Sequence, residues 1–321
     1  MLDSFDLMKI QNLLNIKTQE LRVELLKEYK KIGEDLTEHI TESFISKVKS
    51  IKDIEQSKKI YSIQDHKNKK YIRNKNCWAY DIDLTAISPW NSTGHNTRAG
   101  TAITKHHIIY ATHYPINIGS TVTFVNKHNE VIEKTLINSS RVFGTDITIG
   151  LLDSKLPDSI KPVKLLPRFW KDYVATEYNH IVDINNGILI KKFPVLCLDQ
   201  EEKALIHELQ AIVGNKEVSC RKSTGILEKF GELIVPGDSG NPCLTVIDNE
   251  LVLLCTWFSG GGGSGPFVSG DVYLTKEMAL KNVLQEIQNK TYDVLFPPNN
   301  PPMKETLLEF IDLWRFRKVS P

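Results

Sequence analysis

The stretch Pro236–Pro242 reads Pro-Gly-Asp-Ser-Gly-Asn-Pro, and it is the most informative string in the sequence. Ser239 stands between two glycines on a predicted tight turn. Glycine adopts backbone angles that other residues avoid, so such a turn presents the hydroxyl outward and lets backbone N–H groups point at one spot. The nucleophile of an acyl-transfer enzyme needs this arrangement. A plain surface turn is the alternative, and the rest of the chain must decide between the two.

A serine hydroxyl is a weak nucleophile at neutral pH, so it needs a general base and a carboxylate that orients the base. His113 follows the run 107–112 and precedes Tyr114, which predicts a position where a strand ends in a turn. Asp146 begins the apolar run 146–152, at the mouth of a predicted buried strand. The chain order is therefore His, Asp, Ser, whereas an α/β-hydrolase has its histidine last.

Other residues compete for these roles. The competing histidines are His95, His106 and His107. The last two are adjacent, so on a strand they point to opposite faces and cannot both serve one site. The carboxylates Asp153 and Asp172 do not begin a strand and are predicted to be surface residues. A metal site built on the histidines is the least favoured alternative, so we predict neither a metal nor a cofactor.

Composition excludes several classes of protein. The 321 residues are 41% hydrophobic and 25% charged, which is typical of soluble globular proteins. The net charge of +1 gives no global reason to expect nucleic acid or a membrane surface as a partner. We recognise neither an 18-residue apolar run nor a signal peptide. The five cysteines are never spaced as Cys-x-x-Cys, so we expect reduced thiols in a cytoplasmic protein, with one or two disulfides as the alternative.

The first 75 residues differ from the rest because they lack proline and are rich in Lys and Glu. Apolar residues recur at helical spacing from Leu7 to Ile32 and from Ile40 to Ile51, with Gly33 between the two sets. This pattern predicts a helical hairpin or coiled-coil extension over 1–75, which would serve docking or self-association, with an inhibitory propeptide as the alternative. The basic run 67–75 is predicted to be a solvated linker rather than a nucleic-acid patch.

From Cys77 onward, short β-type runs alternate with turn residues, which favours a barrel or a sandwich. The predicted strands are 78–87, 100–104, 107–111, 121–125, 146–152 and 251–257. A helical pattern returns at 275–288. Residues 291–321 are predicted to be a Pro-rich linker and a short helical tail, with an amphipathic piece at 305–316.

In this order and context, the motifs resemble those of the trypsin/chymotrypsin-like serine peptidases. Residues 111–113 (Ala-Thr-His) resemble the histidine motif of that family, 145–152 its aspartate strand, and 237–242 its nucleophile motif. Residues 255–258 (Cys-Thr-Trp-Phe) resemble the strand that lines its substrate cleft. The predicted helix at 275–288 falls where the closing helix of the family would lie.

The resemblance covers about residues 77–290 and implies a mainly β, chymotrypsin-like peptidase domain over 76–290. It implies two antiparallel six-stranded barrels, at about 77–165 and 175–275, with the active site in the cleft between them. It also implies a metal-independent serine endopeptidase that works through an acyl-enzyme on a protein or peptide substrate.

The resemblance also implies a role for each site residue. Ser239 would attack the scissile carbonyl, and His113 would act as general base and then as general acid. Asp146 would hold the imidazole tautomer and complete a His-Asp-Ser triad. The backbone N–H groups of Gly237 and Ser239 would form the oxyanion hole.

The resemblance further predicts the substrate specificity. Leu233 would lie at the base of the primary pocket, where an acidic residue would be needed to select Lys or Arg. Thr256 and Trp257 would belong to the same pocket, and Phe258 and Phe267 would narrow it from two walls. We therefore expect cleavage after small or medium apolar residues.

Two features depart from the family. Tyr114 stands where secreted members usually have Cys, and no basic cleavage site with an Ile-Val-Gly-Gly type start precedes residue 77. In the family, a freed N-terminus pairs with the aspartate beside the nucleophile. Asp238 here must find another partner, or residues 1–75 must act through a different mechanism. A catalytically silent protein-binding module on the same fold is the alternative function, although such a module has no chemical need for all three site residues.

Overall fold

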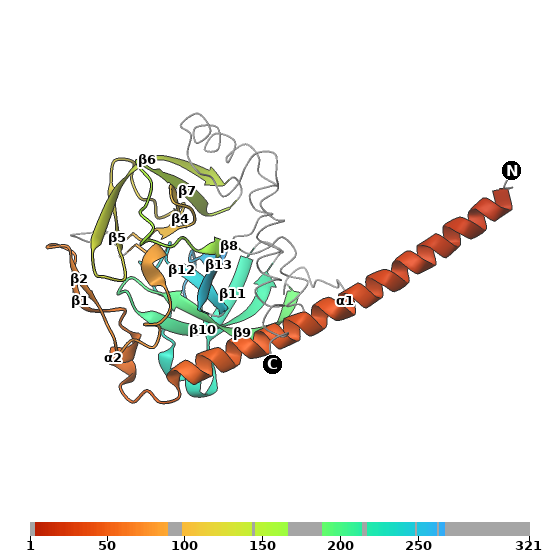
Figure 1. Cartoon of the computed structure of the whole chain (residues 1–321), viewed down its shortest axis with the longest axis horizontal. Helices are drawn as coiled ribbons and strands as arrows, with labels where there is room; N and C mark the ends of the chain where they lie inside the picture. Colours follow the sequence, from red (N-terminus) through yellow and green to blue (C-terminus); the bar gives the residue numbers. More distant parts are fainter. Residues whose placement is uncertain are drawn as a thin grey trace.

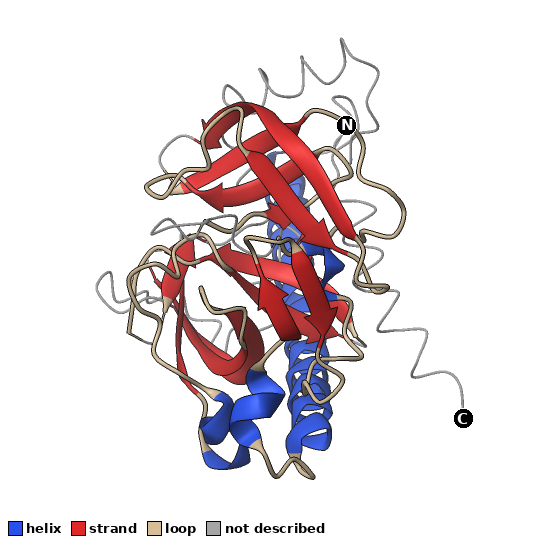
Figure 2. Cartoon of the chain, turned by 90° about the vertical axis from the view of Figure 1, so that its left-hand side faces the viewer, coloured by secondary structure: helices blue, strands red, loops and turns tan. Residues whose placement is uncertain are grey.

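The computed structural model describes residues 4–88, 98–142, 145–165, 188–213, 217–247, 249–261 and 263–266. The chain is mainly β, with a sheet curled into a half-barrel. The strands gather into two groups, one above the other in Figure 2, and a long helix runs along the lower group (Figure 1). The predicted helix at 275–288, the tail at 291–321 and Phe267 lie outside the described residues.

The upper group is a five-stranded sheet with the order β3-β4-β7-β6-β5. Its strands are β3 (Thr101–Ala102), β4 (His107–Ala111), β5 (Thr121–Val125), β6 (Val131–Val142) and β7 (Ile147–Leu152). All residues of β4 and β7 are buried, which explains why both strands read as continuous apolar runs in the sequence. Their antiparallel register pairs Ala111 with Ile147, so the residues just after β4 lie beside the residue just before β7.

The lower group is a seven-stranded sheet with the order β14-β11-β10-β9-β12-β13-β8. Its strands are β8 (Lys164–Leu165), β9 (Ile188–Leu198), β10 (Ala204–Val213), β11 (Glu217–Lys222), β12 (Pro242–Ile247), β13 (Glu250–Thr256) and β14 (Ser264–Pro266). Its neighbouring strands pair antiparallel except β13 and β8. The described strands thus divide into sheets of five and seven, and the closure of two six-stranded barrels stays a prediction.

Most strand predictions from the sequence are confirmed. The runs 107–111 and 121–125 match β4 and β5 at both ends, and 146–152 and 251–257 match β7 and β13 to within one residue. The run 100–104 contains only the short β3.

The strand predicted at 78–87 is wrong, because the chain forms turns and a 3₁₀ helix there, η1 (Leu84–Ala86). Asp83 caps η1 by accepting hydrogen bonds from the N–H and the hydroxyl of Thr85, at 3.1 and 2.6 Å. Most of the apolar residues of this stretch are buried, and Ile87 alone among them is described as pairing with a strand, by a single bridge to Thr101 of β3. Burial rather than strand pairing therefore explains most of the apolar run.

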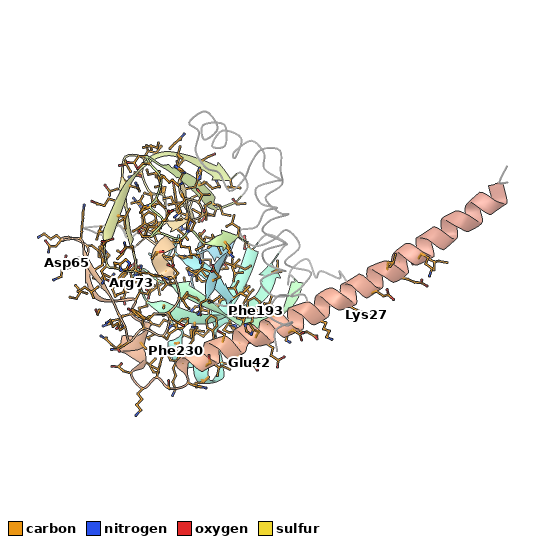
Figure 3. All side chains as sticks on the ribbon, viewed as in Figure 1. Lys27, Glu42, Asp65, Arg73, Phe193 and Phe230 are labelled. Carbon is orange, nitrogen blue, oxygen red and sulfur yellow. The ribbon has the colours of Figure 1, made fainter. Side chains whose placement is uncertain are left out.

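The predicted helical hairpin is also wrong, because a single helix, α1 (Ser4–Val48), continues through Gly33. A glycine costs a helix only about 1 kcal/mol relative to alanine. Burial of the last part of α1 outweighs that cost: Leu36, Ile40, Phe44 and Val48 are at most 3% exposed. This part of the helix, near Glu42 in Figure 3, lies against the buried side chains of Phe193 and Phe230. The first half of α1 projects away from the sheets (Figure 1).

The basic run 67–75 is not a solvated linker. It belongs to a hairpin of β1 (Tyr61–Asp65) and β2 (Lys70–Arg73), which follows the short helix α2 (Ile54–Lys58). Tyr71 is buried with its ring centroid 5.5 Å from that of Tyr61. Arg73 donates hydrogen bonds to the backbone carbonyls of Val125, the last residue of β5, and Asn126. The hairpin is therefore docked on the upper sheet.

No described helix is long and apolar enough to cross a membrane.

We predict that Phe44→Ala lowers the free energy of unfolding by about 3 to 5 kcal/mol, because the ring is 1% exposed and stacks near Trp78, with centroids 5.4 Å apart. Urea unfolding measures the loss. Ile45→Ala is the matched control, since Ile45 is 37% exposed on the same helix turn, and it should change stability by less than about 0.5 kcal/mol. Equal small effects of both variants would show that α1 is not part of the core.

Candidate active site

The loop between Leu233 and Pro242 depends on two glycines. Gly237 has a φ of +106° and Gly240 a φ of +87°, which are angles that L-residues rarely adopt. A Cβ on Gly237 would also lie 2.2 Å from Oε1 of Gln200. The positive φ angles therefore favour glycine at both positions.

Backbone hydrogen bonds attach this loop to the end of β13. The N–H of Gly240 donates to the carbonyl of Trp257 at 2.9 Å, and the N–H of Trp257 donates to the carbonyl of Asn241 at 3.0 Å. Within the loop, the N–H of Asn241 donates to the carbonyl of Asp238 at 3.0 Å. These bonds fix Ser239, whose side chain is partly exposed.

The structure brings Asp146, His113 and Ser239 into one hydrogen-bonded chain. Nδ1 of His113 lies 2.6 Å from Oδ2 of Asp146, and Nε2 of His113 lies 2.9 Å from Oγ of Ser239. The second carboxylate oxygen of Asp146 accepts the backbone N–H of His113 at 2.9 Å. Asp146 thus holds both the ring and the backbone of His113. With the proton on Nδ1, the lone pair of Nε2 faces the serine hydroxyl.

The three residues come from both groups of strands. His113 follows β4 and Asp146 precedes β7, and the N–H of Thr112 donates to the carbonyl of Asp146 at 2.8 Å. Ser239 comes from the lower group, three residues before β12. The candidate site therefore lies where the two groups meet. His113 is 46% exposed at its side chain and Asp146 only 20%, so the base is open to a substrate while the carboxylate is shielded.

The residues predicted for the substrate pocket are placed less uniformly. Leu233 is 59% exposed, and its place at the base of the pocket stays a prediction. Thr256 and Trp257 are fully buried, and only Phe258 is partly exposed. A Cβ on Gly263 would lie 2.8 Å from the indole of Trp257. Thr256 and Trp257 therefore belong to the core at the end of β13 and do not line an exposed surface.

The competing residues do not approach this arrangement. His106 and His107 are both buried, and Nδ1 of His107 lies 2.7 Å from Oγ1 of Thr104. Burial lowers the pKa of His107 to about 4, so this ring stays neutral. Asp153 is exposed, as predicted, while His95 and Asp172 lie outside the described residues. Among the described residues, no group of three or more His, Cys, Asp or Glu side chains could hold a metal ion.

The partner of Asp238, which the sequence left open, is the backbone. Its Oδ1 accepts the N–H of Gln200 at 2.9 Å, and its Oδ2 accepts the N–H of Val235 at 2.7 Å. The side chain is fully buried, and burial raises its pKa in spite of these two hydrogen bonds. Asp238 therefore ties the loop that carries Ser239 to the turn between β9 and β10.

Asp199, a buried carboxyl in that turn, is not among the residues predicted from the sequence. Its Oδ1 accepts the N–H groups of Glu201 and Lys203, each at 2.9 Å, and the side chain is 6% exposed. Burial raises the pKa of Asp199 to about 7, and the nearby Asp238 carboxylate contributes to the increase. An Asp at the end of a strand, followed by polar residues, is a signal for such a side-chain-to-backbone turn.

We predict that Asp199→Asn stabilises the protein at high pH. The raised pKa means that ionising Asp199 costs the folded state stability; this cost is absent below about pH 4, grows up to about pH 7 and is complete above it. Asn keeps the oxygen acceptor without the charge. The free energy of unfolding should rise by about 2 to 4 kcal/mol at pH 8 and hardly change near pH 4.

Urea unfolding at both pH values measures this difference, with the exposed Asp153→Asn as the control. A gain that is equal at pH 4 and pH 8 would rule out the ionisation of Asp199 as its cause.

No protein-family model matches the chain, and no curated protein matches its sequence.

Proposed function

We propose that the protein is a serine endopeptidase with a chymotrypsin-like fold, and that it hydrolyses peptide bonds through Ser239, His113 and Asp146. The observation that carries the proposal is the hydrogen-bonded chain from Asp146 Oδ2 through the His113 ring to Ser239 Oγ, with links of 2.6 and 2.9 Å. A nucleophile, a base within hydrogen-bond distance of it and a carboxylate that orients the base are the parts that serine acylation requires.

The reaction follows from this geometry. Ser239 Oγ attacks the carbonyl carbon of the scissile bond while Nε2 of His113 takes the hydroxyl proton, and Asp146 stabilises the imidazolium that forms. The backbone N–H groups of Gly237 and Ser239 are proposed to bind the oxyanion, each contributing about 3 to 4 kcal/mol. His113 then gives its proton to the leaving amine. A water molecule, activated by the same histidine, releases the acyl group from Ser239.

The arrangement of the strands supports the fold proposal. The nucleophile comes from one antiparallel group and the base and the carboxylate come from the other, in the chain order His, Asp, Ser. An α/β-hydrolase would need a mainly parallel sheet and a histidine that follows the serine. Among the described strands, only β13 and β8 pair in parallel.

We further propose a protein or peptide substrate that is cleaved after a small or medium apolar residue. Phe258 is the partly exposed wall of the proposed pocket, and no acidic side chain stands at Leu233 to select a basic residue. The five cysteines are buried free thiols, and a reducing compartment such as the cytoplasm suits that state.

A catalytically silent binding module is the second candidate, and the shape of α1 favours it. The first half of this helix projects from the sheets, and Ile16 and Leu21 are 52% and 64% exposed there (Figure 1). Exposed apolar residues on a projecting helix suit a contact with a partner or with a second copy of the chain. Measurements of catalysis separate the two candidates.

We predict that Ser239→Ala abolishes peptide hydrolysis, lowering kcat by about 10⁴-fold or more. Asp146→Asn should lower kcat by about 10⁴-fold while both proteins stay folded, because an amide no longer fixes the productive imidazole tautomer. Release of a fluorophore from a mixed peptide library measures the rates. Ser62→Ala, at an exposed serine of β1, is the control and should keep full activity.

A Ser239→Ala variant that is as active as the parent would contradict the peptidase proposal. A folded parent without any hydrolase activity would instead favour the binding module.

The predicted specificity can be read from the same library. Cleavage should occur mainly after residues such as Ala or Val, and Phe258→Gly should extend it to Leu and Phe, because removal of the ring widens the proposed pocket. Mass spectrometry of the products identifies the residue before each cleaved bond. Cleavage mainly after Arg or Lys would contradict the assignment of Leu233 and Phe258 to the pocket.

A further inference from the structure

Lys58 is a buried cation at the end of α2, and only 3% of its side chain is exposed. Its Nζ lies 2.6 Å from Oε1 of Glu55 and 2.5 Å from Oε1 of Glu232. Glu55 is 73% exposed and Glu232 only 31%, so the ion pair with Glu232 is the better shielded of the two. A buried ammonium group is stable only when it is paired, which makes this contact costly to break.

The backbone around Lys58 is held in place. Nδ2 of the buried Asn74 donates hydrogen bonds to the carbonyls two residues before and one residue after Lys58, at 2.7 and 2.9 Å. The N–H of Trp78 donates to the carbonyl of Ser57 at 2.9 Å, and its indole N–H donates to the carbonyl of Ala204 at 2.7 Å. The ammonium group therefore occupies a fixed position against the lower group of strands.

Glu232 connects the ion pair of Lys58 to the chain that leads to Ser239, because it lies seven residues before Ser239. Its second carboxylate oxygen, Oε2, lies 2.9 Å from Nζ of Lys203, so both oxygens are paired. Two residues further on, Ile234 exchanges two backbone hydrogen bonds with Gly261, at 2.9 and 2.8 Å. The start of the loop that carries Ser239 is therefore held by the ion pairs of Glu232 and by the backbone hydrogen bonds of Ile234.

The N-terminal segment also holds the turn that binds Asp238. The N–H of Ile60 donates to the carbonyl of Glu202 at 3.1 Å. The same turn donates the N–H of Gln200 to Asp238, the residue next to Ser239. The segment from Lys58 to Ile60 thus contacts Glu232 and the turn between β9 and β10. Glu232 precedes the loop that carries Ser239, and the turn is hydrogen-bonded to that loop.

We propose that Lys58 is a positioning residue for the loop that carries Ser239. By holding Glu232, it keeps that loop in the conformation in which Ser239 Oγ lies within hydrogen-bond distance of His113. This inference rests on the proposed function. It makes the segment around α2 part of the working enzyme, so removal of that segment inactivates the site rather than activating it.

The test compares the full-length parent with Lys58→Met, Lys58→Arg and Glu232→Gln. The readouts are the second-order rate of labelling by a fluorophosphonate, and kcat and KM for p-nitrophenyl acetate, all measured well below the melting temperature of each variant. Lys58→Met should lower the labelling rate and kcat by about tenfold or more and change KM little, because a displaced nucleophile slows acylation. Lys58→Arg should restore most of the rate.

Lys161→Met is the matched control, since Nζ of Lys161 lies 2.6 Å from Glu250 in a half-exposed ion pair, and its rate should equal that of the parent. Glu232→Gln should slow labelling as Lys58→Met does, and the double variant should be no slower than either single one. Glu232→Gln alone also tests the inference if Lys58→Met does not fold.

Equal labelling rates of the parent and the folded variants, or faster labelling of Lys58→Met, would overturn the inference and leave the proposed function intact. A parent that is not labelled at all would overturn both.

Discussion

The antiparallel pairing of β4 with β7 is the constraint on which the candidate site depends. Because Ala111 lies opposite Ile147, the chain leaving β4 and the chain entering β7 meet at one edge of the sheet. Asp146 can then accept hydrogen bonds from both the ring and the backbone of His113. A slip of one residue in this register would turn the two side chains to opposite faces. The pairing of Ala111 with Ile147 therefore sets the relative positions of His113 and Asp146.

The position of Ser239 depends on a different set of constraints in the lower group of strands. Positive φ angles at Gly237 and Gly240 shape the loop, and Asp238 ties it to the turn after β9. The turn also carries Asp199, a buried carboxyl whose pKa is raised by burial and by the nearby Asp238 carboxylate. Two buried carboxyls near each other are stable only when backbone N–H groups donate hydrogen bonds to them or when bound protons remove their charge. The N-terminal segment adds one buried cation, Lys58, which pairs with Glu232 before the loop.

The sequence predicted the features that depend on short-range pattern. Apolar runs bounded by turn residues identified β4, β5, β7 and β13, and strand ends with His or Asp identified two residues that the structure brings together.

The errors arose where tertiary packing overrides local preference. Gly33 does not end α1, because burial of the following turns outweighs its cost. The run 78–87 is apolar because most of its apolar side chains are buried, although the run does not form a strand. The basic run 67–75 also contains Tyr71, whose side chain is buried. The ion pair of Lys58 joins residues 174 positions apart, a separation at which a single sequence gives no signal.

The central claim is that His113 and Asp146 activate Ser239, and labelling with a fluorophosphonate tests it most directly, because the probe reacts only with an activated serine. The intact mass of the parent and of Ser239→Ala would be measured after exposure to the probe, followed by peptide mapping of the adduct. We expect one adduct per chain, located on Ser239, and none on the variant. An unlabelled parent that is fully folded, or an adduct that persists in Ser239→Ala, would contradict the claim.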